Sequence, residues 1–364
     1  MSGLFPFDTG FGTLSTGNVA MIFVGILLLY LGIARKMEPL LLIPIGFGIM
    51  LVNLPLGGMM DYEFSLRAPQ QGTVMTVEVR EGERFTKGDI IIKLDTGDVV
   101  APVFGRVDNV QVLKGAHVEK GDILASTITM EQTNQAEIPT KPIGLLSIIF
   151  TFGVMWQILP PLMFLCLGAL TDFGPMLANP KTLLLGAAAQ FGVYFAFFLA
   201  LLAGFSMAEA SAIGIIGGAE GPTTIYVTSI LAPHIIGATA VACYSYMALV
   251  PVILPPVIRL LTTKEERKIY MKPQMRPVGR TEKILFPVIT AIVVILFVPS
   301  SAPLMGCFMV GNLFRESGVV ERLSTTAQTS FVDILTIFLT LAIGASMPAD
   351  NFLQPKTLLI LVLG

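Results

Sequence analysis

The feature that most constrains this chain is a series of apolar segments long enough to cross a lipid bilayer. A membrane helix needs about 20 mostly apolar residues. Segments of this kind occupy residues 18–34, 39–56, 143–168, 182–205, 234–261, 284–299, 303–314 and 327–347. Only 13% of the residues are charged, whereas soluble domains carry roughly 25%. The pattern predicts an all-α polytopic membrane protein. The apolar run that starts at Thr357 stops at Gly364, so we expect the sequence to end inside a span.

The distribution of lysine and arginine predicts the orientation of these spans. Seven basic residues lie between residues 262 and 283, and Arg35 and Lys36 follow the first span. Basic loops remain on the cytoplasmic side, so both segments are expected inside and the N-terminus outside. This count requires residues 208–231 to enter the membrane and return on the same side. The net charge of −2 gives no indication of a nucleic-acid partner.

A polar insert with an internal repeat separates the second and third spans. Residues 68–74 match 101–107, and Lys87-Gly88-Asp89-Ile90 matches Lys120-Gly121-Asp122-Ile123, a period of 33 residues. Alternating valines between glycine turns predict short strands, so we expect residues 62–141 to form a small all-β barrel-sandwich domain. The insert resembles the biotinyl/lipoyl family. The stretch that joins its halves, residues 93–100, lacks that family's methionine-flanked lysine, so the insert itself is not expected to be biotinylated.

The most informative membrane segment is an apolar helix interrupted by glycine, a carboxylate and proline. It reads Gly217-Gly218-Ala219-Glu220-Gly221-Pro222-Thr223-Thr224. Glycine and proline break helices, and a charged residue at membrane depth marks a functional site by default. Unwound carbonyls, a carboxylate and hydroxyls suit a hard cation, as in the discontinuous helices of secondary transporters. The sequence predicts a sodium site formed by Glu220, Gly217, Gly218, Thr223 and Thr224; the alternative is a purely structural polar turn.

A second repeat predicts inverted halves of the membrane part. Residues 168–169 followed by Pro180-Lys181-Thr182 recur as residues 344–345 followed by Pro355-Lys356-Thr357. The predicted orientation places the first Pro-Lys-Thr inside and the second outside, which is an inverted arrangement. We therefore divide the chain into a hairpin (1–61), the insert (62–141), a first repeat (142–261), a basic loop (262–283) and a second, truncated repeat (284–364). The counterpart of Glu220 is expected near position 395, beyond this sequence.

Several long motifs carry a family resemblance. They are residues 36–41, 171–175, 217–226, 242–251, 254–256, 264–268 and 311–323. With these motifs the chain resembles the β subunits of sodium-pumping, biotin-dependent decarboxylases that act on oxaloacetate, methylmalonyl-CoA or glutaconyl-CoA. The resemblance covers nearly everything except the insert. The family has aspartate where this chain has Glu220, so the glutamate keeps the charge and adds a methylene.

The resemblance implies a mechanism and a set of site residues. A carboxyltransferase α subunit would present carboxybiotin on its carrier domain, and the β subunit would release CO2, consume a proton and export sodium. Glu220, Tyr246 and Asp172 match positions of the family's motifs and are the expected catalytic residues, and Arg315 is a candidate for contact with anionic substrate. The resemblance further implies a small γ subunit, a trimer of β subunits and the inner membrane of a bacterium. The alternative function is a sodium-coupled carboxylate symporter that needs no biotin.

Overall fold

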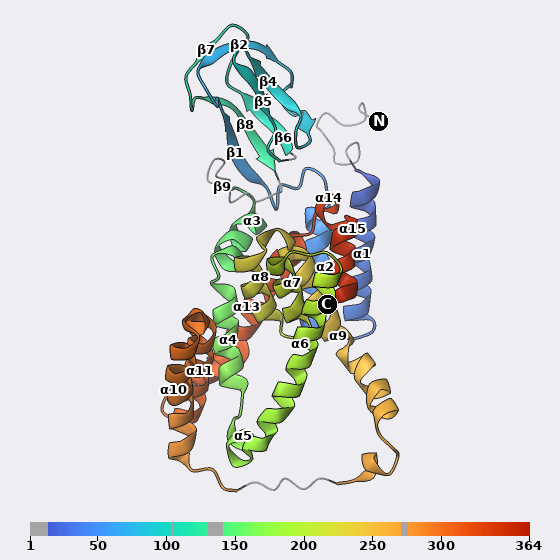
Figure 1. The fold of residues 1–364 in the computed structure, drawn as a ribbon, viewed down its shortest axis with the longest axis vertical. Helices are drawn as coiled ribbons and strands as arrows, with labels where there is room; N and C mark the ends of the chain where they lie inside the picture. The colour runs from blue at the N-terminus through green and yellow to red at the C-terminus, as the bar shows by residue number, and fades with distance from the viewer. Residues whose placement is uncertain (1–13, 104, 130–140, 271–275) are drawn as a thin grey trace. The chain divides into compact units, whose positions relative to one another are not determined.

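The computed structural model describes residues 14–103, 105–129, 141–270 and 276–364 of the chain. It contains two compact units (Figure 1). The helical unit comprises residues 1–55 and 149–364, and the β unit comprises residues 56–148. The insert predicted at 62–141 therefore corresponds to a separate unit with slightly wider bounds.

The helical unit consists of apolar helices interrupted at glycine and proline. Before the broken segment they are α1 (Thr16–Ile33), α2 (Pro39–Val52), α4 (Leu159–Leu170), α5 (Gly174–Ala178) and α6 (Leu183–Leu202), with the π-helix η2 (Phe150–Met155) and the 3₁₀ turn η3 (Pro180–Thr182). The short helix α3 (Leu145–Ile149) lies where the β unit ends. After it come α9 (Ile236–Leu261), α10 (Arg280–Phe297), α11 (Ala302–Ser317), α12 (Glu321–Thr326), α13 (Val332–Ala345), α14 (Ala349–Phe352) and α15 (Pro355–Leu363).

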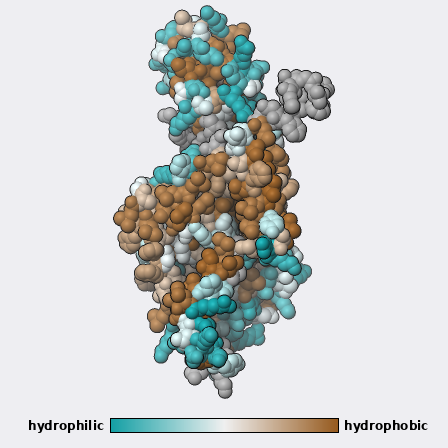
Figure 2. Space-filling model, turned by 90° about the vertical axis from the view of Figure 1, so that its right-hand side faces the viewer, coloured by the Kyte–Doolittle hydropathy of each residue, from teal (hydrophilic) through white to brown (hydrophobic). Residues whose placement is uncertain are grey.

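The lengths of these helices agree with a membrane protein. Among the described residues, three helical segments are long and apolar enough to cross a membrane, namely Thr16–Ile33, Pro180–Leu202 and Glu321–Ala345. The number rises to five if two helix pairs, bent by 64° and 62°, each count as one span. The other expected spans coincide with the shorter helices α2 and α11 and with α10, which is as long as α1 but begins with the charged residues Arg280, Glu282 and Lys283. Apolar side chains cover much of the visible face of the helical unit (Figure 2).

Glycine sets the closest helix contacts in this unit. A Cβ atom on Gly168 of α4 would lie 1.9 Å from the carbonyl oxygen of Phe308, and one on Gly311 of α11 would lie 1.9 Å from that of Leu165. A carbonyl of α13 likewise lies 2.4 Å from the position that a Cβ on Gly48 of α2 would take. Small residues at such crossings let backbones approach closely, which is how helices associate in lipid.

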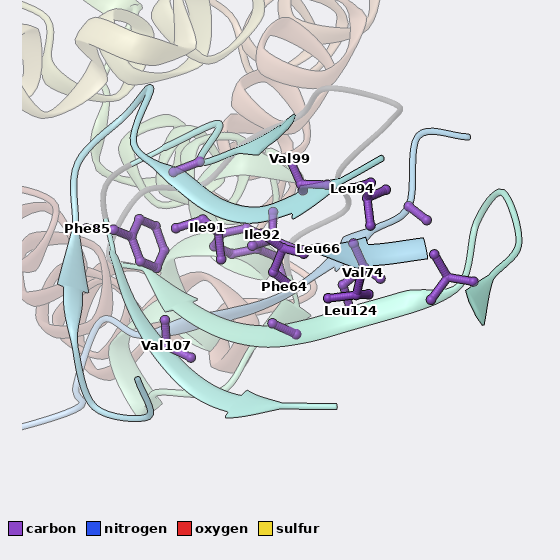
Figure 3. Packing of buried hydrophobic residues seen from close by; sticks show 14 of the residues in the cluster. Phe64, Leu66, Val74, Phe85, Ile91, Ile92, Leu94, Val99, Val107 and Leu124 are labelled. Atoms are coloured by element: carbon purple, nitrogen blue, oxygen red, sulfur yellow. The ribbon is translucent and has the colours of Figure 1, made fainter. Parts of the chain in front are cut away.

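The β unit consists of two antiparallel sheets around one apolar core. One sheet has the order β3-β6-β8-β1-β9 and the other β5-β4-β2-β7. The strands are β1 (Tyr62–Arg67), β2 (Gly72–Val77), β3 (Arg84–Phe85), β4 (Ile90–Leu94), β5 (Gly97–Val100), β6 (Gly105–Val110), β7 (His117–Val118), β8 (Ile123–Thr129) and β9 (Lys141–Pro142). Side chains from both sheets, such as Phe64, Ile92 and Leu124, point into the core between them (Figure 3).

The internal repeat of the insert is visible in its turns. Gly88 and Gly121, 33 residues apart, both have a φ of +96°, a conformation that favours glycine. The amide of Gly88 donates to the carbonyl of Ala101, and that of Gly121 donates to Ala68, the residue equivalent to Ala101. Each half therefore closes its turn on the other half. The two halves of the sequence fold as equivalent, reciprocally bonded units.

Candidate functional site

The interrupted segment forms a hairpin of two half-helices. α7 (Met207–Ile216) ends where Gly217 begins, and α8 (Gly221–Leu231) starts directly after Glu220. The side chains of Glu209, at the start of α7, and His234, just past the end of α8, lie 3.1 Å apart. The open ends of the hairpin therefore meet, and residues 217–220 form its tip. The predicted break is observed, and the two half-helices fold back on each other; the return to the same side of a membrane stays a prediction.

Glu220 caps the second half-helix. One oxygen of its carboxylate accepts hydrogen bonds from the backbone N–H of Thr223, at 3.2 Å, and from the Thr223 hydroxyl. The hydroxyl of Thr224, which is fully buried, donates to the Glu220 carbonyl oxygen at 2.7 Å. The positive end of the α8 dipole stabilises a negative charge at this position. The structure thus brings three of the predicted site residues together and holds the carboxylate at the tip.

The first half-helix ends with free carbonyl groups. The amides of Gly217 and Gly218 each donate to a carbonyl three residues earlier, at 3.0 Å. In the described part of the chain, no group donates a hydrogen bond to the carbonyl oxygens of Gly217, Gly218 or Ala219. These oxygens lie at the negative end of the α7 dipole, where a cation is favoured. Unbonded carbonyl oxygens and a carboxylate therefore occur within the same four residues, 217–220.

A third helix supports the tip by backbone contact. A Cβ atom on Gly217 would lie 2.5 Å from the carbonyl oxygen of Gly192, which is near the middle of α6, and one on Gly192 would lie 2.7 Å from the Gly217 carbonyl oxygen. Because α6 is one of the segments long enough to cross a membrane, contact with its middle places the tip midway along a span. No group of three or more His, Cys, Asp or Glu side chains suited to a metal occurs among the described residues.

Tyr246 contacts a different helix. It lies in α9, and its hydroxyl donates to the carbonyl of Leu361 in α15. No described hydrogen bond joins it to Glu220. The catalytic role expected for Tyr246 therefore stays a prediction.

Asp172 and Arg315 come together in a separate cluster where α4 meets α11. The Arg315 guanidinium donates to the carbonyl of Leu170 at 2.5 Å and lies 4.0 Å from the Asp172 carboxylate. Lys283 lies 3.6 Å from Asp172 and 3.7 Å from Glu316. Among the described contacts, none links this cluster to Glu220. Two acids and two bases neutralise each other here, and the roles expected for Asp172 and Arg315 stay predictions.

The surroundings of Asp172 predict an acid-sensitive contribution to stability. The backbone N–H of Gly174, 2.9 Å away, holds the pKa of Asp172 below its usual range, and Lys283 and Arg315 act in the same direction. A lowered folded-state pKa contributes stability above the unfolded value of about 3.9, and that stability is lost as pH falls through the folded value. Replacing Asp172 with asparagine should therefore reduce stability at pH 7 by less than about 1 kcal/mol, since the side chain is half exposed.

Thermal unfolding of both proteins in detergent, measured from pH 7 down to pH 3, tests this prediction. The midpoints of wild type and variant should converge as the pH falls. A difference that stays constant or grows towards acid pH would contradict it.

Analysis of the sequence missed the buried carboxylate at the base of the hairpin. One oxygen of Glu209 accepts from the Ser206 amide at 2.9 Å, and the other accepts from Lys356 at 2.7 Å and contacts His234. Its side chain is 6% exposed, whereas those of Lys356 and His234 are 57% and 65% exposed. The signal was present: Ser206-Met207-Ala208-Glu209 before an apolar run is a capping box. The contact with α15, 147 residues away, required the structure.

Glu209 should hold the hairpin base through its charge. Replacing it with glutamine preserves the capping box but removes the charged acceptor of two bonds, and we expect a loss of about 2 kcal/mol in the free energy of unfolding. Thermal unfolding of the purified protein at low and high salt measures this loss of stability. Lys356→Met should cause a comparable loss. Lys181→Met, at the corresponding place in the earlier Pro-Lys-Thr, should cause none, and equal effects of the two lysine variants would refute the assignment.

Several apolar helices long enough to cross a membrane, together with a half-buried carboxylate at the tip of a broken hairpin, are typical of a membrane protein. Comparison with known proteins makes this more specific. Residues 17–364 match the family model described as the Na⁺-transporting oxaloacetate decarboxylase beta subunit. The chain therefore belongs to this family of membrane subunits.

Individual relatives cover almost the whole chain. It is 46% identical to the probable oxaloacetate decarboxylase beta chain of Vibrio cholerae serotype O1, over 98% of this chain and 78% of that protein. It is 45% identical to the methylmalonyl-CoA decarboxylase subunit beta of Propionigenium modestum, over 99% and 77%, and 42% identical to the subunit of the same name from Veillonella parvula, over 98% and 73%. The resemblance drawn from the motifs is confirmed, and the beta designation implies that these proteins act with other subunits.

Proposed function

We propose that this chain is the membrane subunit of a decarboxylase sodium pump. It would release CO2 from carboxybiotin presented by a partner and couple this reaction to sodium export across the inner membrane of a bacterium. The observation that carries the proposal is the hairpin tip, where Glu220 caps α8 and directly follows the free carbonyls that end α7. The alternative, a symporter without decarboxylase activity, has no support from the relatives above.

The geometry of the tip supports sodium as the transported ion. Glu220 supplies a full negative charge, and Gly217 and Gly218 supply carbonyl oxygens. Thr223 and Thr224 donate their hydroxyl protons to Glu220, so their oxygen lone pairs remain available. Oxygen donors of this kind match a hard cation. The same five residues that the sequence indicated are therefore proposed to bind the ion.

Coupling requires that decarboxylation depend on the occupied ion site. Breaking the C–N bond of carboxybiotin releases CO2 and leaves an electron pair on the ureido nitrogen, which takes up one proton. Glu220 and Tyr246 are the groups proposed to link this proton to the ion, with Asp172 as a further catalytic candidate and Arg315 as a contact for the substrate carboxylate. An ionisable cluster that serves both events prevents CO2 release without sodium movement.

The order of elements supports inverted repeats in the membrane part. α4 is followed by α5, Pro180-Lys181-Thr182 and α6, and α13 is followed by α14 and then by Pro355-Lys356-Thr357 at the start of α15. The helix after each Pro-Lys-Thr contacts the hairpin region: α6 packs on α7 through Gly192 and Gly217, and Lys356 binds Glu209. The helices that follow the two Pro-Lys-Thr sequences thus contact the same hairpin, α6 at its tip and α15 at its base.

The proposed partners follow from the family. They are an α subunit with a carboxyltransferase and a biotin carrier domain, a small γ subunit, and two further copies of the β chain. The test is reconstitution of the chain with these partners in proteoliposomes. Supplying carboxylated carrier should give CO2 release that requires sodium and is matched by sodium movement. Sodium movement without CO2 release would support the symporter instead, and CO2 release that is indifferent to sodium would refute the pump.

A further inference from the structure

A second tyrosine of α9 lies directly at the hairpin tip. Tyr244 is 3% exposed. A Cβ atom placed on Gly221, the residue after Glu220, would lie 2.6 Å from its ring carbon Cε1, 2.8 Å from Cζ and 2.9 Å from the hydroxyl oxygen. The hydroxyl end of the ring thus rests on the first residue of α8, beside the charged group of the site.

Tyr244 and Tyr246 face different parts of the molecule. Residues two apart on a helix do not share a face, and the contacts show this separation. Tyr246 reaches Leu361 of α15. The sulfur of Cys243, next to Tyr244, lies 3.5 Å from the Thr224 hydroxyl oxygen. The stretch Cys243-Tyr244 therefore forms the wall of the tip on the α9 side.

None of the hydrogen bonds among the described residues involves the hydroxyl of Tyr244. A phenol oxygen can accept as well as donate, so its lone pairs are available to a further group. The residue that it contacts, Gly221, directly follows Glu220 and the free carbonyls that end α7. A cation bound at the tip could take the phenol oxygen as a ligand through a lone pair.

We propose that the hydroxyl oxygen of Tyr244 is a ligand of the transported monovalent cation at the hairpin tip. This inference rests on the proposed function and adds a ligand that the sequence motifs did not single out. Glu220 contributes the charge and α7 the carbonyls, and Tyr244 closes the site from α9. Because the ring packs against Gly221, the position of its oxygen is set before the ion binds.

Replacing Tyr244 with phenylalanine tests the proposal without changing the packing. In the reconstituted complex, the sodium concentration that gives half-maximal CO2 release should rise about tenfold, a typical effect of losing a group that tunes metal affinity. The maximal rate at saturating sodium should stay within about twofold of wild type. Tyr194→Phe, at an exposed position of α6, is the matched control and should change neither value.

A binding measurement separates this proposal from the pump itself. Thermal unfolding of the complex in NaCl and in choline chloride should show stabilisation by sodium, and Tyr244→Phe should need about tenfold more NaCl for the same shift. A lower maximal rate with unchanged half-saturation would make the hydroxyl a proton donor and overturn the proposal, and so would unchanged values for both. If wild type itself shows neither sodium-dependent CO2 release nor sodium stabilisation, the proposed function fails.

Gly221→Ala provides an independent check, because its Cβ would displace the Tyr244 ring. It should weaken sodium dependence in the same direction as Tyr244→Phe. The double variant should be no worse than the more affected single variant, since both changes remove one interaction. Additive effects would show that Gly221 acts on the ion by another route and would contradict the assignment.

Discussion

Replacing Glu220 with glutamine is expected to abolish sodium-dependent decarboxylation. The side chain keeps its length and can still accept from the Thr223 amide and hydroxyl, so the cap of α8 is preserved and only the charge is lost. A unit charge about 4 Å away contributes about 4 kcal/mol at an effective dielectric constant near 20. This corresponds to a loss of sodium affinity on the order of 100-fold to 1000-fold.

The experiment is CO2 release from carboxylated carrier as a function of sodium concentration, in proteoliposomes that contain the complete complex. Glu220→Asp is the control, because it keeps the charge and restores the residue that the resembled family has at this position. We expect it to retain sodium dependence. Thermal unfolding of Glu220→Gln should match wild type in sodium-free buffer. An unaltered sodium response in Glu220→Gln would remove the carboxylate from the mechanism.

Replacing Gly311 with alanine is expected to have the largest effect on folding. The new methyl group would lie 1.9 Å from the carbonyl oxygen of Leu165, which is backbone and cannot rotate away, so α11 and α4 must separate. Separation also weakens the hydrogen bonds of the buried Asn312 amide to the carbonyls of Gly168 and Thr171. Overpacking of this kind costs about 3 kcal/mol.

Thermal unfolding in detergent and yield of membrane-inserted protein measure this effect. The midpoint should fall by at least about 5 °C. Gly306→Ala is the matched control, because Gly306 lies in the same helix and a Cβ there has no neighbour within 4 Å. It should leave the midpoint unchanged or raise it slightly, as alanine favours helix over glycine. Equal midpoints for the two variants would contradict the close packing of α4 and α11.

The sequence was most informative where physical rules are local. Apolar length indicated the helices, and Gly217-Gly218 and Gly221-Pro222 located the break between α7 and α8 to within a residue. The 33-residue repeat of the insert predicted two equivalent halves, and the matching turns at Gly88 and Gly121 show them. The roles expected for Asp172, Tyr246 and Arg315 depend on the distances between side chains that are far apart in the sequence. Rules that act on neighbouring residues could not predict these distances.

Two kinds of information thus combine in this protein. The sequence by itself determined the membrane class, the family, the broken helix and its carboxylate, because hydrophobic length and helix-breaking residues act on neighbours in the chain. Only the tertiary structure decided that Tyr244 rather than Tyr246 rests on the hairpin tip, and that Glu209 binds Lys356 across 147 residues. These contacts depend on the rotation of α9 and the position of α15, which the packing of helices sets and no sequence spacing encodes.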